Sequence, residues 1–524
     1  MSEDKTVEAR KEKIKIWLKD RDNLILLAVL AFAIIIRLYF FFITQNQAVW
    51  WDEGEYMLRV KHIVLDTPQD GFFSGRELFT PYFWALIYLL FKSEVAIRFV
   101  QLVISVLTVY ATYMLGKYVY DKKIGILSAL FMSAFWLHLF FTTRLLTYLY
   151  APLFYTLALA FFWKGYISEN EPHKDRYLFL SFLTIIIGLG IYTSIAFSAF
   201  AIIIYLFATE RFAFLKNKRL WISAAKAAPF LLLSFIPSYI VQGTFIPRLR
   251  QIGEIKATET GAGLKGIMTY ITMMPRLALF IYLIIMILSL FLVIRFLFFS
   301  DVIYKNKSYG YVKNDFYIFL GGLVIFGFYT WVSITAGGPA GANYDAWILP
   351  VFPFAFVLMS RFVYYIKENF ISKISGERER KAAFALIIII ILFGAYQHIS
   401  FANDSIKGKV DSFYNLKPAG IWIKENSVKG DTFVTSAVPE MTYYAERGVV
   451  GFSNGTYNMS VEWFLEQVRA KKPKYYVLTV WERSPEWAYS LPESGKLNMT
   501  PVQAYYVDPQ RQQSDVAIYR ITYN

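Results

Sequence analysis

The sequence predicts an α-helical protein that crosses a membrane many times and ends in a small α/β domain. Three observations predict this fold class. Hydrophobic residues make up 56% of the 524 residues, aromatic residues make up 19%, and the mean hydropathy is +0.40, which exceeds that of ordinary soluble domains. Apolar segments long enough to span about 30 Å of hydrocarbon recur between residues 24 and 396. Residues 398–524 lack such segments, so we expect a soluble domain there.

Lysine and arginine residues gather in the short hydrophilic gaps between the apolar segments. The formal net charge of +15 alone would suit a nucleic-acid-binding protein, but this placement argues against that class. Loops rich in Lys and Arg stay on the cytoplasmic side, so we interpret the gaps as cytoplasmic; binding of anionic lipid is compatible with the same charges. The gaps carry Arg10, Lys11, Lys13, Lys15, Lys19, Lys117, Lys122, Lys123, Lys164, Lys174, Arg176, Arg211, Lys216, Lys218, Arg219, Lys305, Lys307, Lys313, Lys367, Lys373, Arg378, Arg380 and Lys381.

We place the crossings so that every basic gap faces the cytoplasm. Residues 1–22 form a charged tail, and the apolar run after them has no small-residue cleavage site, so we expect it to be a retained span. The transmembrane domain covers residues 23–397, and an odd number of crossings puts the amino terminus inside and residues 398–524 outside. The eleven predicted crossings are 24–44, 94–116, 124–141, 145–163, 177–192, 193–209, 222–241, 276–298, 315–335, 346–365 and 382–397.

The first outer loop, residues 45–93, is predicted to hold two helices at the membrane surface. Pro81 to Phe91 is apolar but too short to span, and counting it as a crossing would move a basic gap to the outside. Before it, Glu53 to Leu65 has the apolar spacing of one helix face. Those apolar positions are Tyr56, Met57, Val60, Ile63 and Val64.

Two further outer segments and the end of the chain complete the organisation. Residues 242–275 include a loop with glycines and charges that we expect to be mobile, and residues 336–344 form a short glycine-rich loop. In residues 398–524, helical patterns alternate with β-branched or aromatic runs, which predicts a small α/β domain. Glycosylation sequons give weak support for an outside location: Asn403, Asn454, Asn458 and Asn498 lie in that domain and Asn306 lies elsewhere.

The strongest candidates for chemistry are Asp52 and Glu53. They directly follow the first crossing and begin the first predicted surface helix, where the helix dipole favours anions. Ionisable groups at a membrane boundary are candidates for function, and these two carboxylates could serve as a general base or as metal ligands. The alternative is structural: a helix N-cap beside an aromatic belt in which Trp50 and Trp51 are anchors. The chain contains no cysteine, which excludes thiolate nucleophiles and disulfides.

Arg144 adds a cation on the same side of the membrane. It lies at a predicted outer helix boundary, where it could bind an anionic headgroup such as a lipid phosphate. Its alternative is an arginine that snorkels to the interface. Arg37 and Arg98 also have two interpretations: each could pair with an acid or snorkel to the interface.

An ordered series of motifs between residues 24 and 165 resembles a known family. The Asp52-Glu53 pair, the proline-led surface helix and Arg144 with Tyr148 stand in the order found in polyprenyl-phosphate-sugar-dependent glycosyltransferases of the GT-C superfamily. The resemblance is to family 39, which includes protein O-mannosyltransferases and the aminoarabinose transferase of lipid A. The other matching segments are Pro81-Tyr82-Phe83-Trp84, Ala96-Ile97-Arg98-Phe99, Tyr113-Met114-Leu115-Gly116-Lys117, Gly125-Ile126-Leu127-Ser128-Ala129-Leu130 and Ala160-Phe161-Phe162.

The resemblance implies a reaction at the outer face of the membrane. In that family a sugar moves from a polyprenyl phosphate to an acceptor with inversion, and the first acid of the pair is the catalytic one, which corresponds to Asp52, with Glu53 beside it. Arg144 and Tyr148 would contact the lipid phosphate or the sugar. The acceptor would be a protein, a lipid-linked glycan or an envelope polymer. The donor already carries a phosphate leaving group, so no nucleotide site is needed, and the sequence has no P-loop.

The chain departs from the family pattern at several positions. Thr80 stands before Pro81 where relatives carry His or Lys, no Asp follows Arg144 closely, and Ala346-Trp347 replaces a late Arg-Tyr. The phosphate contacts therefore stay open, with Arg76, Arg248 and Arg250 as substitutes. A requirement for a divalent metal ion also stays open, with Asp52 and Glu53 as its ligands if there is one.

Three other readings compete with a family 39 transferase. An oligosaccharyltransferase hallmark begins Trp-Trp-Asp, but residues 50–52 lie in the first outer loop and not in the soluble domain, so we treat that match as coincidence. A lipid-linked sugar transporter or flippase would show inverted repeats and no large outer domain, and the sequence shows no repeat. A catalytically inactive glycan-binding relative remains a further reading. The sequence thus favours a multi-pass cell-membrane transferase.

Overall fold

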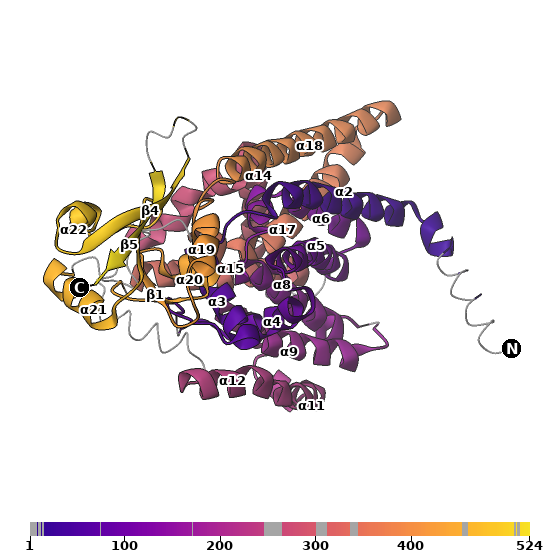
Figure 1. Ribbon diagram of the computed structural model, residues 1–524. Coiled ribbons are helices and arrows are strands. Elements are labelled where there is room, and N and C mark those ends of the chain that lie inside the picture. The colour runs from indigo at the N-terminus through magenta and orange to yellow at the C-terminus, as the bar shows by residue number, and fades with distance from the viewer. Residues whose placement is uncertain are drawn as a thin grey trace.

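Each of the eleven predicted crossings corresponds to a helical segment of the computed structural model (Figure 1). The structure describes residues 15–73, 75–169, 171–245, 265–299, 312–335, 344–452, 459–507 and 514–523, together with Glu8, Glu12 and Gln510. The helices of the bundle are α2 (Arg21–Thr44), α5 (Glu94–Val119), α6 (Lys122–Ala134), α7 (Trp136–Phe141), α8 (Tyr150–Phe162), α9 (Lys174–Ile191), α10 (Phe197–Glu210), α11 (Lys218–Ala227), α12 (Leu232–Gln242), α14 (Lys265–Phe299), α15 (Val312–Thr335), α17 (Phe352–Asn369) and α18 (Glu377–Lys407).

Eight helical segments of the described residues are long and apolar enough to cross a membrane by themselves. The three other predicted crossings are helical but shorter or more polar. The segment 124–141 is interrupted at Phe135, where the backbone is extended between α6 and α7. The segment 145–163 opens with a turn, so that α8 begins only at Tyr150, and α9 carries three charged residues in its first turn. Length and hydropathy alone therefore identify eight crossings, whereas the threading by basic loops predicts eleven.

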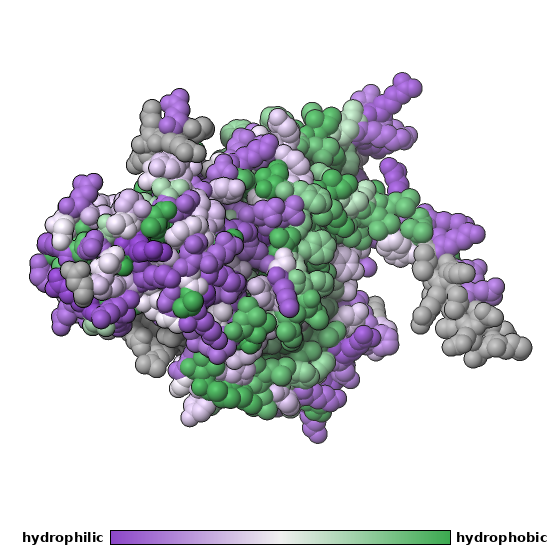
Figure 2. Space-filling model, in the orientation of Figure 1, coloured by the Kyte–Doolittle hydropathy of each residue, from purple (hydrophilic) through white to green (hydrophobic). Residues whose placement is uncertain are grey.

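Polar contacts join the ends of neighbouring helices on both sides of the bundle, as an antiparallel threading requires. At one end Lys122 Nζ lies 2.6 Å from Asp20 Oδ2, and Tyr166 Oη donates to Glu210 Oε2 at 2.8 Å. At the other end Thr44 Oγ1 and Thr143 Oγ1 are 2.6 Å apart. Figure 1 shows the start of α2 and the C-terminal domain at opposite ends, and Figure 2 shows a wide apolar band between two hydrophilic surfaces. The structure is thus that of a multi-pass membrane protein, and the assignment of one end to the cytoplasm stays a prediction.

The C-terminal domain is built on a mixed sheet with the strand order β2-β1-β3-β5-β4, which confirms the predicted α/β class. β1 pairs in parallel with β2 and β3, whereas β5 runs antiparallel to β3 and β4. Because side chains alternate along a strand, Tyr475 packs on the sheet face covered by α19 and α20, and Tyr476 packs on the face covered by α21. The elements are β1 (Thr432–Val434), β2 (Gly448–Val449), β3 (Tyr475–Thr479), β4 (Asn498–Tyr506), β5 (Ser514–Thr522), α19 (Leu416–Glu425), α20 (Val438–Ala445), α21 (Val461–Lys471) and α22 (Glu486–Ser490).

Both helices predicted in the first outer loop are present, but only one lies at the surface. α4 (Phe79–Phe91) exposes Leu86, Leu89 and Leu90, as expected of an interfacial helix. In α3 (Trp51–Leu65) every residue from 53 to 61 is buried, including its charged ones. The helix is covered because α20 packs on it: Lys61 donates to the Tyr443 carbonyl oxygen and to Glu446 Oε1, both at 2.8 Å. α3 is therefore covered on its polar face, which meets the C-terminal domain instead of water.

Candidate active site

The two adjacent acids of α3 face different surroundings. Both lie in the first helical turn, as predicted, and Trp50 is the N-cap residue. Successive helical residues are rotated by about 100° around the axis, so neighbours cannot share one face. The Asp52 side chain is 23% exposed, whereas that of Glu53 is fully buried. The pair thus divides into one accessible and one inaccessible carboxylate.

Glu53 joins the start of α3 to the loop that follows α7. Its Oε1 lies 2.7 Å from Arg144 Nε and accepts the Leu145 backbone N–H at 2.9 Å. Its Oε2 accepts the Trp50 backbone N–H at 3.1 Å and lies 3.7 Å from Arg98 Nη2. A buried carboxylate needs this density of donors because burial removes its hydration. Glu53 is therefore an anchor that fixes where α3 begins.

Arg144 and Arg98 are both engaged on this buried side. The Arg144 guanidinium lies 3.3 Å from the centroid of the Trp50 ring and donates to Gln47 Oε1 at 2.9 Å. Arg98 donates to the carbonyl oxygens of Thr143 and Gln47 at 2.7 and 2.9 Å. The structure thus brings Arg144 together with Glu53, and Trp50 supports that arginine in addition to lying near the membrane boundary. The predicted role of Arg144 at a lipid phosphate stays a prediction.

Asp52 lies in a separate cluster with Arg76 and Tyr148. Arg76 Nη2 donates to Asp52 Oδ1 at 2.7 Å, and Arg76 Nε donates to Glu55 Oε2 at the same distance. The hydroxyl of Tyr148 is 3.5 Å from Asp52 Oδ2, at the outer limit of a hydrogen bond. Trp51 Nε1 donates to Glu55 Oε1 at 3.0 Å, so this tryptophan also supports the cluster. Arg76, named from the sequence as a substitute cation, is therefore the arginine that orients Asp52.

Burial and charge set the ionisation of this cluster. Burial works to lower the pKa of Arg76, but Asp52, Tyr56 and Glu55 outweigh it and hold that pKa well above its usual range. Burial raises the pKa of Glu55 although Arg76 opposes the change. Arg76 is therefore a permanent cation shared by the carboxyl groups of Asp52 and Glu55.

The C-terminal domain adds two carboxyl groups that the sequence analysis missed. Glu440 of α20 is fully buried, and among the described residues its carboxyl oxygens have no hydrogen bond of good geometry. Burial and the neighbouring Glu482 raise its pKa, and burial raises the pKa of Glu482 to about 7, with Asp52 contributing. α20 contacts α3 directly: a β-carbon added at Gly54 would lie 3.1 Å from the Glu440 backbone nitrogen. Periodicity gave no signal for this contact because the helices are nearly 400 residues apart.

Two predicted phosphate contacts and the predicted metal site complete the candidate set. Arg248 and Arg250 lie outside the described residues. Within the described part of the chain, no group of three or more His, Asp and Glu side chains is placed to hold a metal ion. A metal shared by Asp52 and Glu53 does not fit, because the Glu53 oxygens already meet two arginines and two backbone amides. A metal requirement therefore stays a prediction.

Comparisons with known proteins support the resemblance drawn from the sequence. Residues 76–239 match the family model of dolichyl-phosphate-mannose-protein mannosyltransferases. ArnT from Cupriavidus metallidurans bound to undecaprenyl phosphate is similar in structure, with a TM-score of 0.64, 11% identity, and coverage of 94% of this chain and 97% of that one. Its apo state gives a TM-score of 0.61 at 12% identity with the same coverage.

A second solved protein shares the architecture. The archaeal oligosaccharyltransferase AglB from Archaeoglobus fulgidus, in complex with an inhibitory peptide and a dolichol-phosphate, gives a TM-score of 0.55 at 12% identity and covers 86% of this chain and 69% of its own. A comparison with curated proteins finds no significant match. The fold is therefore that of GT-C glycosyltransferases, and the resemblance to that superfamily is confirmed.

Proposed function

We propose that this protein is a membrane glycosyltransferase that moves a sugar from a polyprenyl phosphate to an acceptor on the extracytoplasmic face, with inversion at the anomeric carbon. The observation that carries the proposal is the position of Asp52. It is a partly exposed carboxylate in the first loop of a GT-C fold, held by Arg76 and next to Tyr148. Its neighbour Glu53 is withdrawn from that space, so Asp52 is the accessible acid of the pair.

The chemistry follows from a single displacement. An acceptor hydroxyl or amine attacks the anomeric carbon and passes its proton to Asp52 as the new bond forms. The bond between that carbon and the phosphate oxygen breaks, and the polyprenyl phosphate leaves with the electron pair. Arg76 keeps the Asp52 carboxylate turned toward the acceptor and places positive charge near the departing phosphate. Tyr148 contributes a hydroxyl donor beside the same carboxylate.

The other predicted residues take supporting roles in this proposal. Glu53, with Arg144 and Arg98, fixes the first turn of α3 and so determines where Asp52 stands. Arg248 and Arg250 are proposed as phosphate contacts from the outer loop on sequence grounds alone. We assign the amino terminus to the cytoplasm and the C-terminal domain to the outside, in keeping with the basic loops.

The choice of a lipid-linked donor rests on the structural neighbours. One of them is described as bound to undecaprenyl phosphate and another as complexed with a dolichol-phosphate and an inhibitory peptide. We infer that this chain takes the same class of lipid phosphate, and that a protein, glycan or lipid acceptor approaches from the side of the C-terminal domain. The identity of the sugar is left to experiment.

Transfer by purified protein tests the proposal. Full-length protein in detergent is incubated with undecaprenyl phosphate carrying radiolabelled mannose, glucose or aminoarabinose, in separate reactions with envelope extract as acceptor. Asp52→Asn should lower turnover by about 10²- to 10⁴-fold, the usual contribution of a general base. Asp66→Asn is the matched control, because Asp66 caps the other end of α3, its side chain is 90% exposed, and Asn tolerates the same left-handed backbone.

Two results would overturn the proposal. Transfer that survives in Asp52→Asn at the wild-type rate would remove this carboxylate from the mechanism. Movement of the labelled donor between the leaflets of proteoliposomes, without any transfer to acceptor, would show a flippase instead.

A further inference from the structure

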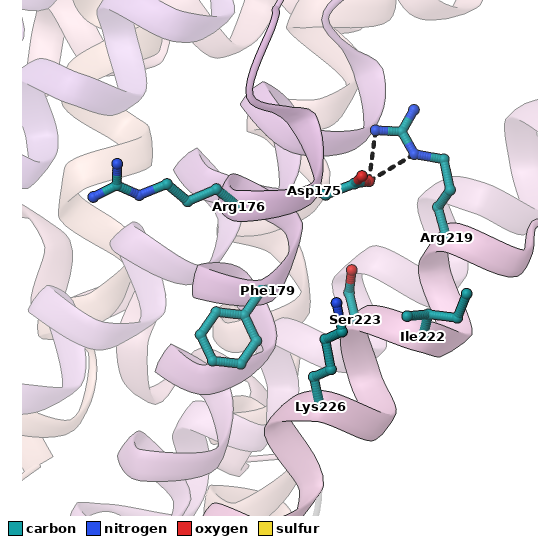
Figure 3. Close-up of a pocket in the computed structure, with 7 residues that line it drawn as sticks. All are labelled: Asp175, Arg176, Phe179, Arg219, Ile222, Ser223 and Lys226. Carbon is teal, nitrogen blue, oxygen red and sulfur yellow. Dashed lines mark hydrogen bonds and ion pairs between the residues drawn. The ribbon is translucent and has the colours of Figure 1, made fainter.

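A small pocket lies between α9 and α11, far from the cluster around Asp52. Its volume is about 330 Å³, and it is lined by Asp175, Arg176, Phe179, Arg219, Ile222, Ser223 and Lys226 (Figure 3). The lining comes from the first turns of α9 and from one side of α11. α11 begins the candidate span Lys218–Gln242, which ends beside the Arg76 backbone at the other end of the bundle. The pocket is thus at the end of the bundle away from the C-terminal domain (Figure 1).

Ser223 is the most informative residue of this pocket. Helical hydroxyl groups usually donate to the carbonyl oxygen one turn earlier. Ser128 and Ser360 do so in this protein, at 2.7 and 2.8 Å. Ser223 is only 4% exposed, yet no hydrogen bond within the described residues involves its hydroxyl. Figure 3 shows that hydroxyl directed into the space between α9 and α11, where it faces the open volume of the pocket.

Cations surround the same space. Arg219, Ser223 and Lys226 are spaced four and three residues apart, which places them on one face of α11. Arg219 contacts Asp175 Oδ1 through Nε and Nη2, at 2.7 and 2.6 Å, and the rest of its guanidinium stays available. Lys226 has no ion-pair or hydrogen-bond partner within the described residues, and Figure 3 shows it extending along α11 toward Ser223. The pocket therefore combines two cations of α11 and a free hydroxyl against a single acid.

Apolar side chains form the remaining wall. Phe179 and Ile222 line the pocket, and Trp221 beside them is 51% exposed. A tryptophan at the start of a membrane-crossing segment is typical of the headgroup level of a bilayer. A ligand that fits has a compact anionic group for the polar wall and hydrocarbon for the apolar one.

We propose that this pocket binds the phosphate of an anionic phospholipid headgroup. The phosphate oxygens would accept from Lys226, Ser223 and the free edge of the Arg219 guanidinium, while the acyl chains lie along Ile222 and Phe179. Because the site is at the opposite end of the bundle from Asp52, it is independent of the donor site and of the proposed transferase activity. The protein would carry a bound lipid on that side.

Native mass spectrometry of the full-length protein tests this site. Protein in a neutral detergent is titrated with phosphatidylglycerol and, separately, with zwitterionic phosphatidylcholine. Wild-type protein should retain one phosphatidylglycerol at concentrations where it retains no phosphatidylcholine. Ser223→Ala and Lys226→Gln should each weaken that binding by about tenfold, the usual worth of one hydrogen bond to a charged group. Lys218→Gln is the matched control, since it removes the same charge from α11 outside the pocket.

The outcomes separate the sources of phosphate and the alternatives. Competition by inorganic phosphate at equal concentration would point to a soluble anion and overturn the lipid assignment. Equal weakening of phosphatidylglycerol binding in Lys218→Gln and Lys226→Gln would show a diffuse attraction to a basic surface and would also overturn the proposed site. Retention of lipid by Ser223→Ala at wild-type affinity would contradict the role of the free hydroxyl.

Discussion

Replacing Glu53 by glutamine should destabilise the folded protein far more than replacing Asp52 by asparagine. The substitution keeps the shape of the side chain and removes its charge. Arg144 and Arg98, both almost fully buried, then lose the only carboxylate that the described contacts give them. The backbone N–H groups of Leu145 and Trp50 donate to different oxygens of Glu53, and glutamine offers only one carbonyl oxygen, so one of the two amides also loses its acceptor.

The expected magnitude follows from the burial of all three groups. Breaking a buried ion pair by removing one partner costs about 3 to 5 kcal/mol, because a charge is left without compensation. That is a change of roughly 10²-fold to several thousandfold in the ratio of folded to unfolded protein. Removing an exposed acid costs about 0 to 1 kcal/mol. Glu377→Gln is the matched control, because Glu377 forms an exposed pair with Lys381.

The assay is thermal unfolding of the purified protein in detergent, followed by intrinsic tryptophan fluorescence. Glu53→Gln should melt at a clearly lower temperature than wild type, and Glu377→Gln and Asp52→Asn should melt close to wild type. The double variant Glu53→Gln with Arg144→Gln should recover part of the loss, since it removes one of the uncompensated cations. Equal melting temperatures for Glu53→Gln and wild type would refute the interpretation of Glu53 as a buried anchor.

Three further predictions concern the rest of the site. Arg76→Gln should lower turnover by about 10²-fold, measured as steady-state transfer, because Asp52 loses the cation that orients it. Arg76→Lys should restore only part of the activity, because the single ammonium group of lysine cannot hold Asp52 and Glu55 at once. Gly54→Ala should lower the melting temperature because its β-carbon would meet α20 at 3.1 Å, whereas Gly327→Ala, with open space around it, should not. Glu482 keeps its proton to higher pH in the folded than in the unfolded protein, so stability should fall as pH rises from 4.5 to about 7, and this slope should flatten in Glu482→Gln.

Much of the membrane fold could be predicted because a bilayer permits few solutions. Hydrocarbon thickness sets the length of each apolar segment, and basic loops set the threading, so the helices from α2 to α18 lie where the sequence placed them. The interruption at Phe135 could not be predicted, since the residues around it are mostly apolar and no proline or glycine marks the break. The burial of α3 was missed because its polar face resembles a face toward water, and its cover comes from a distant part of the chain.

The candidate site divides in the same way. Asp52 and Glu53 could be located at the first turn of a helix from local sequence alone. Their separation into an accessible and a buried acid depends on Arg98 and Arg144, which are 45 and 91 residues from Glu53 along the chain. Arg76 could only be guessed as a partner, because no periodicity links a loop residue to a helix 21 to 24 residues before it. Long-range contacts of this kind are set by tertiary packing.

The helix α18 has a mechanical consequence for the whole molecule. Its 31 residues run without a break from the end of the bundle nearest the amino terminus to the C-terminal domain. At 1.5 Å per residue it is about 46 Å long, roughly 15 Å more than the hydrocarbon it crosses. It acts as a rigid strut that sets the height of the domain above the bilayer, while α20 rests on the helix that carries Asp52. Bilayers of longer acyl chains should therefore strain the contact between α20 and α3. Membrane thickness is then expected to change the position of Asp52.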